Sequence, residues 1–590
     1  MSIPSASKTY RTHLIVLLVV CLLTFFNSLA NDLVWDDIPL IAENVNIRDG
    51  GHIPLFLTPG YWNEQHPYPG HYRPLRAISL AVDYFFWGLN PTGYRLTNIL
   101  LHIVNVLLVY FLAAVIGRRK TGDLAFLTAL FFATHPVHTE SVNLVKNRSD
   151  MLALMFFLLS FLLFAKHLSA SKKSSRWMLF GAWCCFIPAV LSKEMALTLP
   201  GTLVLYIVCF LTGPERRRAM ARIIPYLVMI AGYFWFMHTF ITAAQPPPAG
   251  AALPSGPIQH AGTVIKTIGI YLKMLTVPYP LNAEHAFAVP GSLSDPAVLA
   301  SLAVLLLVLI ITVNMYDRAP VVSFGLGWIL LTLVPAANLV YLVSRPVAEQ
   351  RLYIPSFGFC LLLGYSIARL TQVGAGRWKR RRPVVAGRLL ALLIVVLYAG
   401  LVIERNRDWR DEITFYTRTL AANPDSARMH NNLGIVLNKN GRYAEAIRHY
   451  QAALELYPDY AKPRLNLGVA LCNTGQWEEA VSHFQAGLLL ITSPDNKRYA
   501  GIYNNLGVAL MKLGQLDQSD ALFRKVLTMD PDNISATYNL GGLLMVKGDF
   551  KEAASMFYRV LCLDPAHEPA GREYQYCRKM VDAGTVIPPE

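Results

Sequence analysis

Long apolar runs fill the chain up to about residue 403, and an amphipathic pattern follows to the C-terminus. A membrane-spanning helix needs about 20 apolar residues. Eleven runs meet or approach this length and are predicted as spans: 12–30, 94–117, 122–138, 150–168, 177–191, 196–213, 222–242, 296–316, 320–341, 353–370 and 384–403. The pattern therefore predicts an all-α protein in two parts, a polytopic transmembrane bundle and a soluble C-terminal region.

The first apolar run, His13 to Ala30, follows Lys8 and Arg11 and has two interpretations. A cleaved signal peptide is one of them. The run is about 18 residues long, near the length of a span, and no small-residue cleavage site fits well before Asn31. We therefore expect it to be a retained first span.

Charge sets the expected topology. The 590-residue chain is 54% hydrophobic, only 15% charged and carries a net charge of +15. The basic clusters lie in short loops between apolar runs, where the positive-inside rule puts them, so the excess predicts no nucleic-acid partner. The N-terminus and these loops are expected inside, and eleven spans then send the C-terminal region to the outer face. The clusters are Arg118 to Lys120, Lys172-Lys173, Arg216 to Arg218 and Arg377 to Arg382.

Two expected outer loops are long, 31–93 and 243–295. The first contains an apolar stretch, Leu75 to Leu89, with aromatic residues suited to a headgroup boundary. The second contains Ala261 to Val277, which carries Lys266 and Lys273. We predict both stretches as interfacial helices rather than spans. Residues 245–257 are rich in Pro and Gly and predict an irregular loop.

The C-terminal region repeats itself. Asn-Leu-Gly recurs at 432–434, 466–468, 505–507 and 539–541, with glycine spacings of 34, 39 and 34. Thirty-four residues is the tetratricopeptide period, and each such repeat is a pair of helices. Extra residues near Ser493-Pro494-Asp495 explain the spacing of 39. The region is thus predicted to be an α-solenoid with a concave face that binds polypeptide.

Other positions of the repeat agree. One glycine ends the first helix of each pair, a small residue permits close packing, and an aromatic residue fills the next layer. We divide the chain into a membrane domain (1–403), a connecting helix with half a repeat (404–426), four repeats (427–568) and a capping helix with a tail (569–590). The three sets are Gly441, Gly475, Gly514 and Gly548; Ala446, Ala480, Ser519 and Ala553; and Tyr450, Phe484, Phe523 and Phe557.

Cysteine usage excludes a disulfide or zinc framework, because none of the eight cysteines shows CxxC or Cys/His metal spacing.

Ionisable residues at a membrane face carry a free-energy cost, so they indicate a functional site. Asp36 and Asp37 follow the first span directly. Adjacent carboxylates repel one another, and one of them can act as a general base on an acceptor hydroxyl. For a bare Asp-Asp pair, a solvated turn or a helix N-cap is the preferred explanation.

Further polar groups gather in the other expected outer loops. Arginine suits bidentate phosphate contact, although at a membrane face it also meets lipid headgroups. The combination of carboxylates and cations fits a lipid-linked phosphosugar, with basic groups for the phosphate and a carboxylate for the acceptor. The residues are His71 and Arg73, Arg148, Lys193 and Glu194, and Glu349 and Arg351.

A polar run between two apolar spans contains His135, His138 and Glu140. Two histidines and a glutamate can ligate a metal. Pro136 disturbs the helical geometry that would bring the histidines together, so the metal requirement stays open.

The motifs together resemble the transmembrane and tetratricopeptide-repeat-containing O-mannosyltransferase family and its bacterial relatives. The matching pieces occur in the expected order, with the repeats after the membrane domain. They are VWDD (34–37), YRPL (72–75), HPVHTESV (135–142), NRSDMLA (147–153), LSKE (191–194) and EQRLYIPSFGF (349–359). The resemblance implies a membrane domain of the GT-C glycosyltransferase type.

The resemblance also implies site residues. Asp36 and Asp37 would hold the catalytic base, and Glu140 would be a supporting acidic residue. From charge and placement we expect four cations to face the carrier phosphate, with His71, His135, His138, Glu194 and Glu349 as further candidates. The four cations are Arg73, Arg148, Lys193 and Arg351.

The function implied is transfer of a sugar, mannose or another hexose, from a polyprenyl-phosphate carrier to Ser or Thr hydroxyls of proteins held by the repeats. The expected location is a bacterial inner membrane with a periplasmic array, or the endoplasmic reticulum with a lumenal one. Two alternatives stay open: a non-catalytic membrane scaffold for envelope proteins, and a lipid-linked oligosaccharide ligase. No cofactor is predicted beyond the lipid-linked donor, and a divalent metal is possible.

Overall fold

A computed structural model describes residues 8–68, 71–117, 122–169, 172–241, 256–337, 345–378, 382–491, 493–494 and 496–582. Every regular element within these ranges is helical, as the sequence predicts. The chain divides into two compact units, Met1–Asn423 and Pro424–Glu590. The division falls inside the predicted connecting segment 404–426. Each unit is described separately below.

The first unit contains one helix for each of the eleven predicted spans. Apolar residues surround most of these helices, so their faces meet either one another or lipid. The helices are α1 (Lys8–Phe25), α3 (Pro91–Ile116), α4 (Gly122–Thr134), α6 (Arg148–Ser169), α7 (Lys172–Ser192), α8 (Leu199–Phe210), α10 (Ile224–Phe240), α12 (Pro296–Asn314), α13 (Pro320–Leu333), α14 (Ser356–Trp378) and α15 (Arg382–Asn406).

The predicted number of spans is not confirmed. Seven helical segments in the described ranges are long and apolar enough to cross a membrane. Those containing α4, α8, α13 and α14 are apolar but shorter. The long segments are Thr9–Ala30, Pro91–Ile116, Val145–Ser169, Ser175–Ser192, Gly213–Phe240, Pro296–Asn314 and Val384–Trp409.

Burial separates a central helix from peripheral ones. Most of the segment Val145–Ser169 is buried, whereas almost none of Pro296–Asn314 is. Leu307, Ile310 and Val313 of α12 lie more than half exposed. Exposed apolar surface of this extent marks contact with lipid or protein. The helices of this unit therefore have the burial pattern of a membrane bundle.

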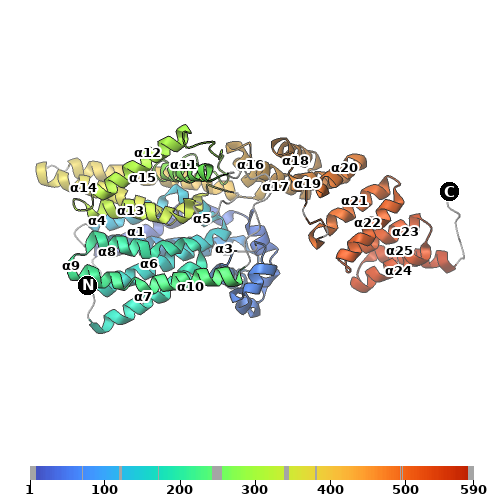
Figure 1. The fold of residues 1–590 in the computed structure, drawn as a ribbon, viewed down its shortest axis with the longest axis horizontal. Coiled ribbons are helices and arrows are strands. Elements are labelled where there is room, and N and C mark those ends of the chain that lie inside the picture. The colour runs from blue at the N-terminus through green and yellow to red at the C-terminus, as the bar shows by residue number, and fades with distance from the viewer. Residues whose placement is uncertain are drawn as a thin grey trace. The chain divides into compact units, whose positions relative to one another are not determined.

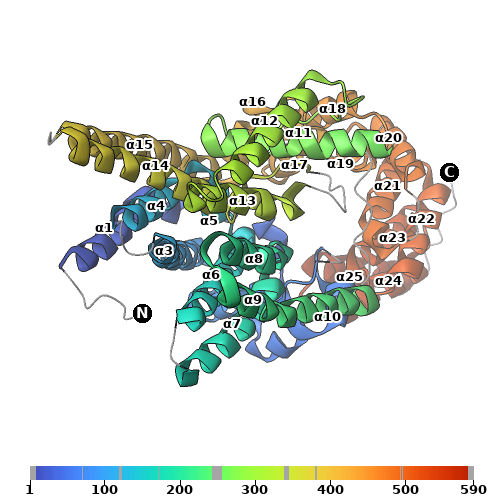
Figure 2. The ribbon, with the colours of Figure 1, turned by 60° about the vertical axis from the view of Figure 1, so that its left-hand side comes forward.

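Both predicted interfacial stretches are helical: α2 (Pro74–Trp87) and α11 (Pro257–Thr276). Neither is among the long apolar segments. On α2, Ala77 and Leu80 are buried while Phe85 and Phe86 are exposed. Helix α11 packs against α12 (Figure 2). Most of the predicted irregular loop 245–257 lies outside the described residues.

Short helices fill the long segment after α1 and the turns between spans. Figure 1 shows those of residues 38–65 in blue at one end of the first unit and α9 (Gly213–Ala221), which carries the basic cluster Arg216 to Arg218, at the other. The short helices are η1 (Phe26–Ala30), η2 (Ile38–Ala42), η3 (Val45–Arg48), η4 (Gly50–Leu57), η5 (Tyr61–Gln65), η6 (Pro136–His138), α5 (Thr139–Asn143), η7 (Val145–Asn147), η8 (Glu194–Thr198), η9 (Pro335–Ala337), η10 (Glu349–Leu352), η11 (Arg407–Trp409) and α16 (Glu412–Ala422).

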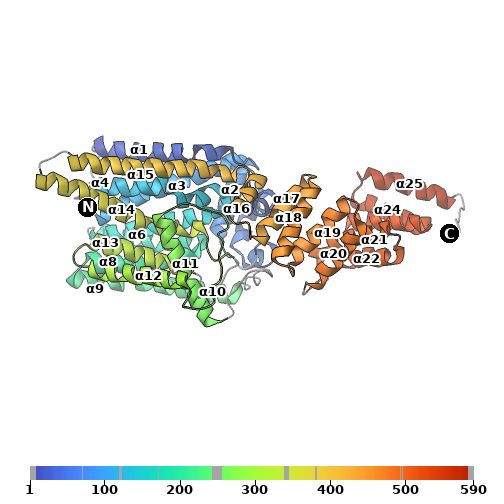
Figure 3. The same ribbon diagram turned by 90° about the horizontal axis from the view of Figure 1, so that it is seen from above.

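Buried asparagines join the first and last helices of this unit, which lie side by side (Figure 3). Asn406 donates to Asn27 Oδ1 at 2.7 Å and to the Thr24 carbonyl at 3.0 Å. Asn31 donates to the Asn406 carbonyl at 2.8 Å. Asn143 connects the loop after α4 to the same group, donating to Asn406 Oδ1 at 2.7 Å. These amides satisfy one another where water is scarce, which fixes the ends of α1 and α15.

The second unit has the predicted helix pairs. The first helices end at glycines with positive φ, between 74° and 83° at Gly441, Gly475, Gly514 and Gly548. The predicted small residues and aromatic residues are buried between the helices of each pair. The helices are α17 (Ala427–Lys439), α18 (Tyr443–Leu456), α19 (Ala461–Asn473), α20 (Trp477–Leu489), η12 (Lys497–Tyr499), α21 (Ala500–Lys512), α22 (Leu516–Met529), α23 (Ile534–Val546) and α24 (Phe550–Leu563).

The predicted capping helix is present as α25 (Glu568–Asp582), which packs against α24. It buries Ala570 and Cys577 against the last repeat. A terminal helix with a polar outer face closes the core of such an array.

Candidate active site

The segments that carry the predicted site residues come together at one end of the first unit. The segment after α1 meets the loop between α4 and α6, and α2 meets the turn between α7 and α8. These segments are far apart in sequence, so packing of the helices creates the cluster.

Asp37 is fully buried and already has its partners. Its carboxylate accepts the backbone N–H of Val145 at 3.1 Å and of Lys146 at 2.7 Å. Burial raises the pKa of Asp37 to about 6, although Arg95 and these two N–H groups act in the opposite direction. Asp37 thus positions the start of the segment that carries Lys146.

Asp36 is partly open, with its side chain 13% exposed. Tyr68 donates its hydroxyl to Asp36 Oδ1 at 2.6 Å, and the Lys146 ammonium contacts Oδ2. Two donors therefore orient a carboxylate that a substrate can still reach. Of the predicted acidic pair, Asp36 is therefore the partly exposed carboxylate and Asp37 the one that accepts two backbone N–H groups.

Trp35 adopts φ = 53°, the one positive value among described residues other than glycine. This region is strained for a bulky side chain, and such strain gathers at functional sites. The Trp35 ring lies 5.3 Å from the Arg345 guanidinium carbon and 5.9 Å from Lys146 Nζ. The strained turn therefore places an aromatic face between two cations beside Asp36.

Glu140 is fully buried and paired. Arg345 binds it through both terminal nitrogens, at 2.9 and 3.1 Å. The Gln350 amide, with its NH₂ turned toward the carboxylate, adds donors at 2.9 Å. A bidentate pair of this kind fixes both partners in one geometry. Glu140 thus anchors Arg345 beside Trp35, which agrees with a supporting role.

Arg351 contacts backbone carbonyls. It donates to Pro346 at 2.8 Å and to Arg345 at 3.1 Å. Glu349, also buried, binds His285 at 3.0 Å and Arg405 at 2.7 Å. Burial would raise the pKa of Glu349, but Arg405 and His285 hold it below its ordinary value. Both residues therefore order the segment that carries Arg345.

The three remaining predicted cations differ in exposure. Arg148 is fully buried, paired with Asp83 at 2.5 Å, and donates to Asn98 and to the Tyr94 carbonyl. Lys193 is also buried, and its ammonium donates to both carboxylate oxygens of Asp150, at 2.6 and 2.7 Å.

Arg73 pairs at 2.7 Å with Glu194, whose side chain is 46% exposed. Arg73 is thus the cation of this group best placed to exchange its partner for a ligand, and His71, two residues earlier, is exposed. The contacts of Arg148 and Lys193 favour structural roles, and their contact with phosphate stays a prediction.

His135 and His138 are buried in the helical core. His135 Nε2 lies 3.1 Å from the Leu275 carbonyl, and His138 Nε2 lies 2.8 Å from the Ser356 hydroxyl. Within the described residues, no group of three or more His, Cys, Asp or Glu side chains is arranged to hold a metal. These histidines therefore have protein partners, and the metal requirement stays a prediction to test.

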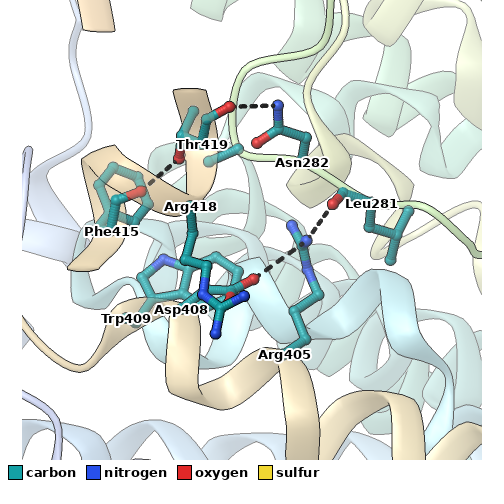
Figure 4. Close-up of a pocket in the computed structure, with 9 residues that line it drawn as sticks. Leu281, Asn282, Arg405, Asp408, Trp409, Phe415, Arg418 and Thr419 are labelled. Atoms are coloured by element: carbon teal, nitrogen blue, oxygen red, sulfur yellow. Dashed lines mark hydrogen bonds and ion pairs between the residues drawn. The ribbon is translucent and has the colours of Figure 1, made fainter. Parts of the chain in front are cut away.

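A small polar pocket lies beside Arg405, the residue that pairs with Glu349 (Figure 4). Arg405 and Asp408 of the α15–η11 end face Leu281 and Asn282, and α16 closes it with Phe415, Arg418 and Thr419. Arg405 donates to the Leu281 carbonyl at 2.5 Å. The Arg405–Leu281 and Asn282–Thr419 contacts connect the loop after α11 to the end of α15 and to α16.

Sequence reasoning missed several partners. Lys146 and Asp150 lie in a charged run between apolar spans. That run is the sequence feature that could have indicated them as site residues. Tyr68 and Arg345 lie outside every matching motif. Their roles depend on contacts across 32 and 205 residues, which no local pattern reveals.

Several stretches of the chain match known protein families. Residues 78–241 match the family "Dolichyl-phosphate-mannose-protein mannosyltransferase". Residues 404–461, 437–506 and 500–533 match tetratricopeptide repeat families.

Two curated relatives are similar over about 70% of the chain. The protein O-mannosyl-transferase Tmtc3 of Drosophila melanogaster is 28% identical over 488 residues, covering 70% of this chain and 52% of the relative. The mouse protein O-mannosyl-transferase TMTC4 is 26% identical over 490 residues, covering 73% and 64%. The chain thus spans about half to two thirds of the length of these relatives.

Among solved structures, YrrB, titled a TPR protein with an unusual peptide-binding site, is 22% identical with a TM-score of 0.25, covering 28% of this chain and 84% of that one. Residues 78–241 therefore resemble the dolichyl-phosphate-mannose-protein mannosyltransferase family, and tetratricopeptide repeats follow. The two relatives carry the name protein O-mannosyl-transferase, which confirms the resemblance indicated by the sequence motifs.

Proposed function

We propose that this chain is an integral-membrane glycosyltransferase that moves a mannose or another hexose from a polyprenyl-phosphate carrier to Ser or Thr hydroxyls of proteins. The observation that carries the proposal is the pairing of Asp36, a partly open carboxylate, with Lys146 and Tyr68 in a unit whose sequence matches the mannosyltransferase family. A fully closed ion pair would not serve an incoming hydroxyl.

The reaction is a single displacement. Asp36 takes the proton of the acceptor hydroxyl, and the oxygen forms a bond to the anomeric carbon. The bond from that carbon to the phosphate oxygen breaks, and polyprenyl phosphate leaves with the electron pair. A positioned general base contributes about 10²- to 10⁴-fold to such a step.

The other charged groups stabilise the leaving phosphate or hold the residues that do so. Lys146 and Arg73 are partly exposed, and their charge favours the leaving phosphate. Asp37 and Glu140 act indirectly, because one holds the backbone at Lys146 and the other holds Arg345. Neither needs to touch the substrate.

The repeats supply the acceptor in this proposal. Stacked helix pairs form a concave face that takes extended polypeptide. On the inner helices, Asn466 donates to Asn431 at 3.0 Å, and Asn539 donates to Asn504 at 3.0 Å. Asn466 and Asn539 are half-buried, so their amides present further polar groups suited to a peptide backbone.

The test is transfer by the purified full-length protein. With a polyprenyl-phosphate-mannose donor and a Ser/Thr-rich acceptor peptide, wild-type protein should add hexose, and Asp36→Asn should reduce the rate by at least about 100-fold. Asp36→Asn removes a charge without changing shape, so its thermal midpoint should stay near the wild-type value. Undiminished transfer by this variant would refute the assignment.

The same assay separates the alternatives. A membrane scaffold would bind the acceptor peptide without transferring sugar. An oligosaccharide ligase would leave the peptide unmodified and use a lipid-linked glycan acceptor instead. Mass spectrometry of envelope proteins from wild-type and deletion strains gives the corresponding result in cells, as hexose lost from specific proteins.

A further inference from the structure

Arg76 is a buried cation whose side chain makes no ion pair with the described residues. It lies in the first turn of α2 and is 2% exposed. The one hydrogen bond of its side chain within the described ranges joins Nη2 to His66 Nε2, at 3.1 Å. No carboxylate of those ranges lies within ion-pair distance of it.

Other buried arginines of this unit are compensated. Arg148 faces Asp83 and Arg405 faces Glu349. Arg95 has no carboxylate in the described ranges but donates to the carbonyls of Asn31, Asp32 and Asn143. Removing a charge from water is costly unless an opposite charge and hydrogen bonds replace the water. Arg76 has a single neutral contact, so its charge is available to an incoming anion.

The contact to His66 contributes no negative charge. An arginine can only donate, so His66 Nε2 accepts and the imidazole is neutral. The proton on Nδ1 is then donated to the Tyr68 carbonyl at 2.9 Å. Burial, and next Arg76, lower the pKa of His66 to about 3, so the ring stays neutral at physiological pH.

The neighbouring charges also leave a positive excess. Arg76 is electrostatically close to Arg73 and Asp36, and His71 is close to Arg73, Arg76 and Lys146. Arg73, Arg76 and Lys146 give three cations against the carboxylates of Asp36 and Glu194. One positive charge remains, on the side where Arg73 and Lys146 are partly exposed.

A chain of contacts connects this cation to the proposed base. Arg76 donates to His66, the His66 ring bonds the backbone of Tyr68, and the Tyr68 hydroxyl donates to Asp36 at 2.6 Å. The links involve His66, Tyr68 and Arg76 together with Asp36. These contacts therefore fix the separation between a carboxylate and a guanidinium that makes no ion pair with the described residues.

We propose that Arg76 is the anchoring residue of a phosphate site, and that the His66–Tyr68 contacts hold it at a fixed distance from Asp36. The planar guanidinium fork matches the oxygens of a phosphate ester. The identity of the ligand, a polyprenyl phosphate, rests on the proposed function. The chemistry of the site, a phosphate group on a buried arginine, rests on the contacts above.

The experiment measures binding of a short-chain polyprenyl phosphate without sugar to full-length protein in phosphatidylcholine nanodiscs. Wild-type protein should bind it and be stabilised, whereas the matching polyprenol should have no effect. Arg76→Gln should weaken binding by about 10- to 100-fold, as expected for loss of charge-assisted hydrogen bonds. The matched control is Arg48→Gln, because Arg48 is an exposed arginine of the same outer segment that donates to the Ala42 carbonyl.

The thermal midpoint without ligand separates a binding role from a folding role. Arg76 has no counter-charge within the described ranges, so Arg76→Gln should unfold at or above the wild-type temperature. Arg76→Lys keeps the charge and loses the fork, and should bind with intermediate affinity. Wild-type affinity in Arg76→Gln, or failure of both variants to fold, would overturn the proposal.

Two competition experiments identify which molecule supplies the phosphate group. Phosphatidylglycerol and inorganic phosphate should compete weakly if the site takes the polyprenyl carrier. Binding of either one as tightly as polyprenyl phosphate, and dependent on Arg76, would support the phosphate site and reject the carrier as its ligand.

Asp36→Asn should keep polyprenyl phosphate binding. Arg76-dependent binding without any sugar transfer by wild-type protein would refute the proposed function and leave this site standing.

Discussion

Arg345 and Glu140, 205 residues apart, form a two-point ion pair in which the carboxylate has no exposure to solvent. Sequence motifs pointed to Glu140 alone. The pairing adds a second residue to that prediction, because Glu140 binds Arg345 through both carboxylate oxygens and so holds its guanidinium beside Trp35.

Arg345→Met should destabilise the protein strongly. It leaves Glu140 charged and buried without its partner, and breaking such a pair costs about 3–5 kcal/mol. Glu140→Gln should cost less, because Arg345 is 12% exposed and can reach water. The free energy of unfolding in mixed micelles measures both. The double variant should recover part of the loss, and an Arg345→Met protein as stable as wild type would contradict the pairing.

Asp37 should give the unfolding free energy a distinctive pH dependence. Its pKa is raised by burial to about 6, against an ordinary value of 3.8. Between these values the folded state holds a proton that the unfolded state has lost. Stability should therefore fall as pH rises from about 4 to about 6, by about 3 kcal/mol for a shift of this size.

The comparison protein for that measurement is Asp37→Asn, which cannot titrate. Its stability profile over pH 4 to 7 should lack the Asp37 contribution and decline less than that of wild type. Parallel profiles for the two proteins would show that folding does not raise the pKa of Asp37, and would contradict the prediction.

Arg73 and Lys193 should separate function from stability. Arg73→Gln releases Glu194, which is 46% exposed and can be solvated, so unfolding should change by about 1 kcal/mol or less. Lys193→Met leaves Asp150, which is 1% exposed, without its partner. This should lower the free energy of unfolding by about 3–5 kcal/mol.

Transfer assays on the same two proteins complete the contrast. Arg73→Gln should lose activity while keeping its thermal midpoint, and Lys193→Met should lose both together. The assignment fails if Arg73→Gln transfers sugar at the wild-type rate.

Gly541 and Gly542, adjacent in α23, should respond oppositely to alanine. A Cβ at Gly541 would lie 2.8 Å from the Phe557 ring, whereas one at Gly542 would meet nothing within 4 Å. Gly541→Ala should destabilise the array by about 1–3 kcal/mol through overpacking. Gly542→Ala should stabilise it by about 0.5–1 kcal/mol, because alanine is the better helix former.

Hydrogen exchange of α23 and α24 in the full-length protein reads out this pair of substitutions. Exchange should quicken in the first variant and slow in the second. The same direction in both would contradict the observed helix contact.

The sequence predicts the elements of this protein better than their connections. The glycines, small residues and aromatic residues of each repeat recur at fixed positions, so the roles of Gly441 and Tyr450 follow from the repeat pattern alone. Apolar runs located the helices of the first unit equally well. Their number as spans stays unconfirmed, since length alone does not separate a short span such as α13 from a buried helix.

The sequence could predict which kinds of residue form the site, but not which of those residues contact one another. Asp36 and Asp37 look alike in sequence, and only their surroundings separate an open carboxylate from one that holds two backbone N–H groups. Arg76 likewise resembles Arg73 in the sequence, because the lack of a counter-charge around it in the described ranges is a property of packing.

The asparagine contacts between Asn27, Asn31 and Asn406 have a consequence for how the protein is made. The ribosome releases α1 long before α15, and over that interval the polar end of α1 lacks the amide that later satisfies it. These contacts can form only once residue 406 has left the ribosome, after all the other predicted spans have been made. A chain truncated before Asn406 would therefore lack them at the end of α1.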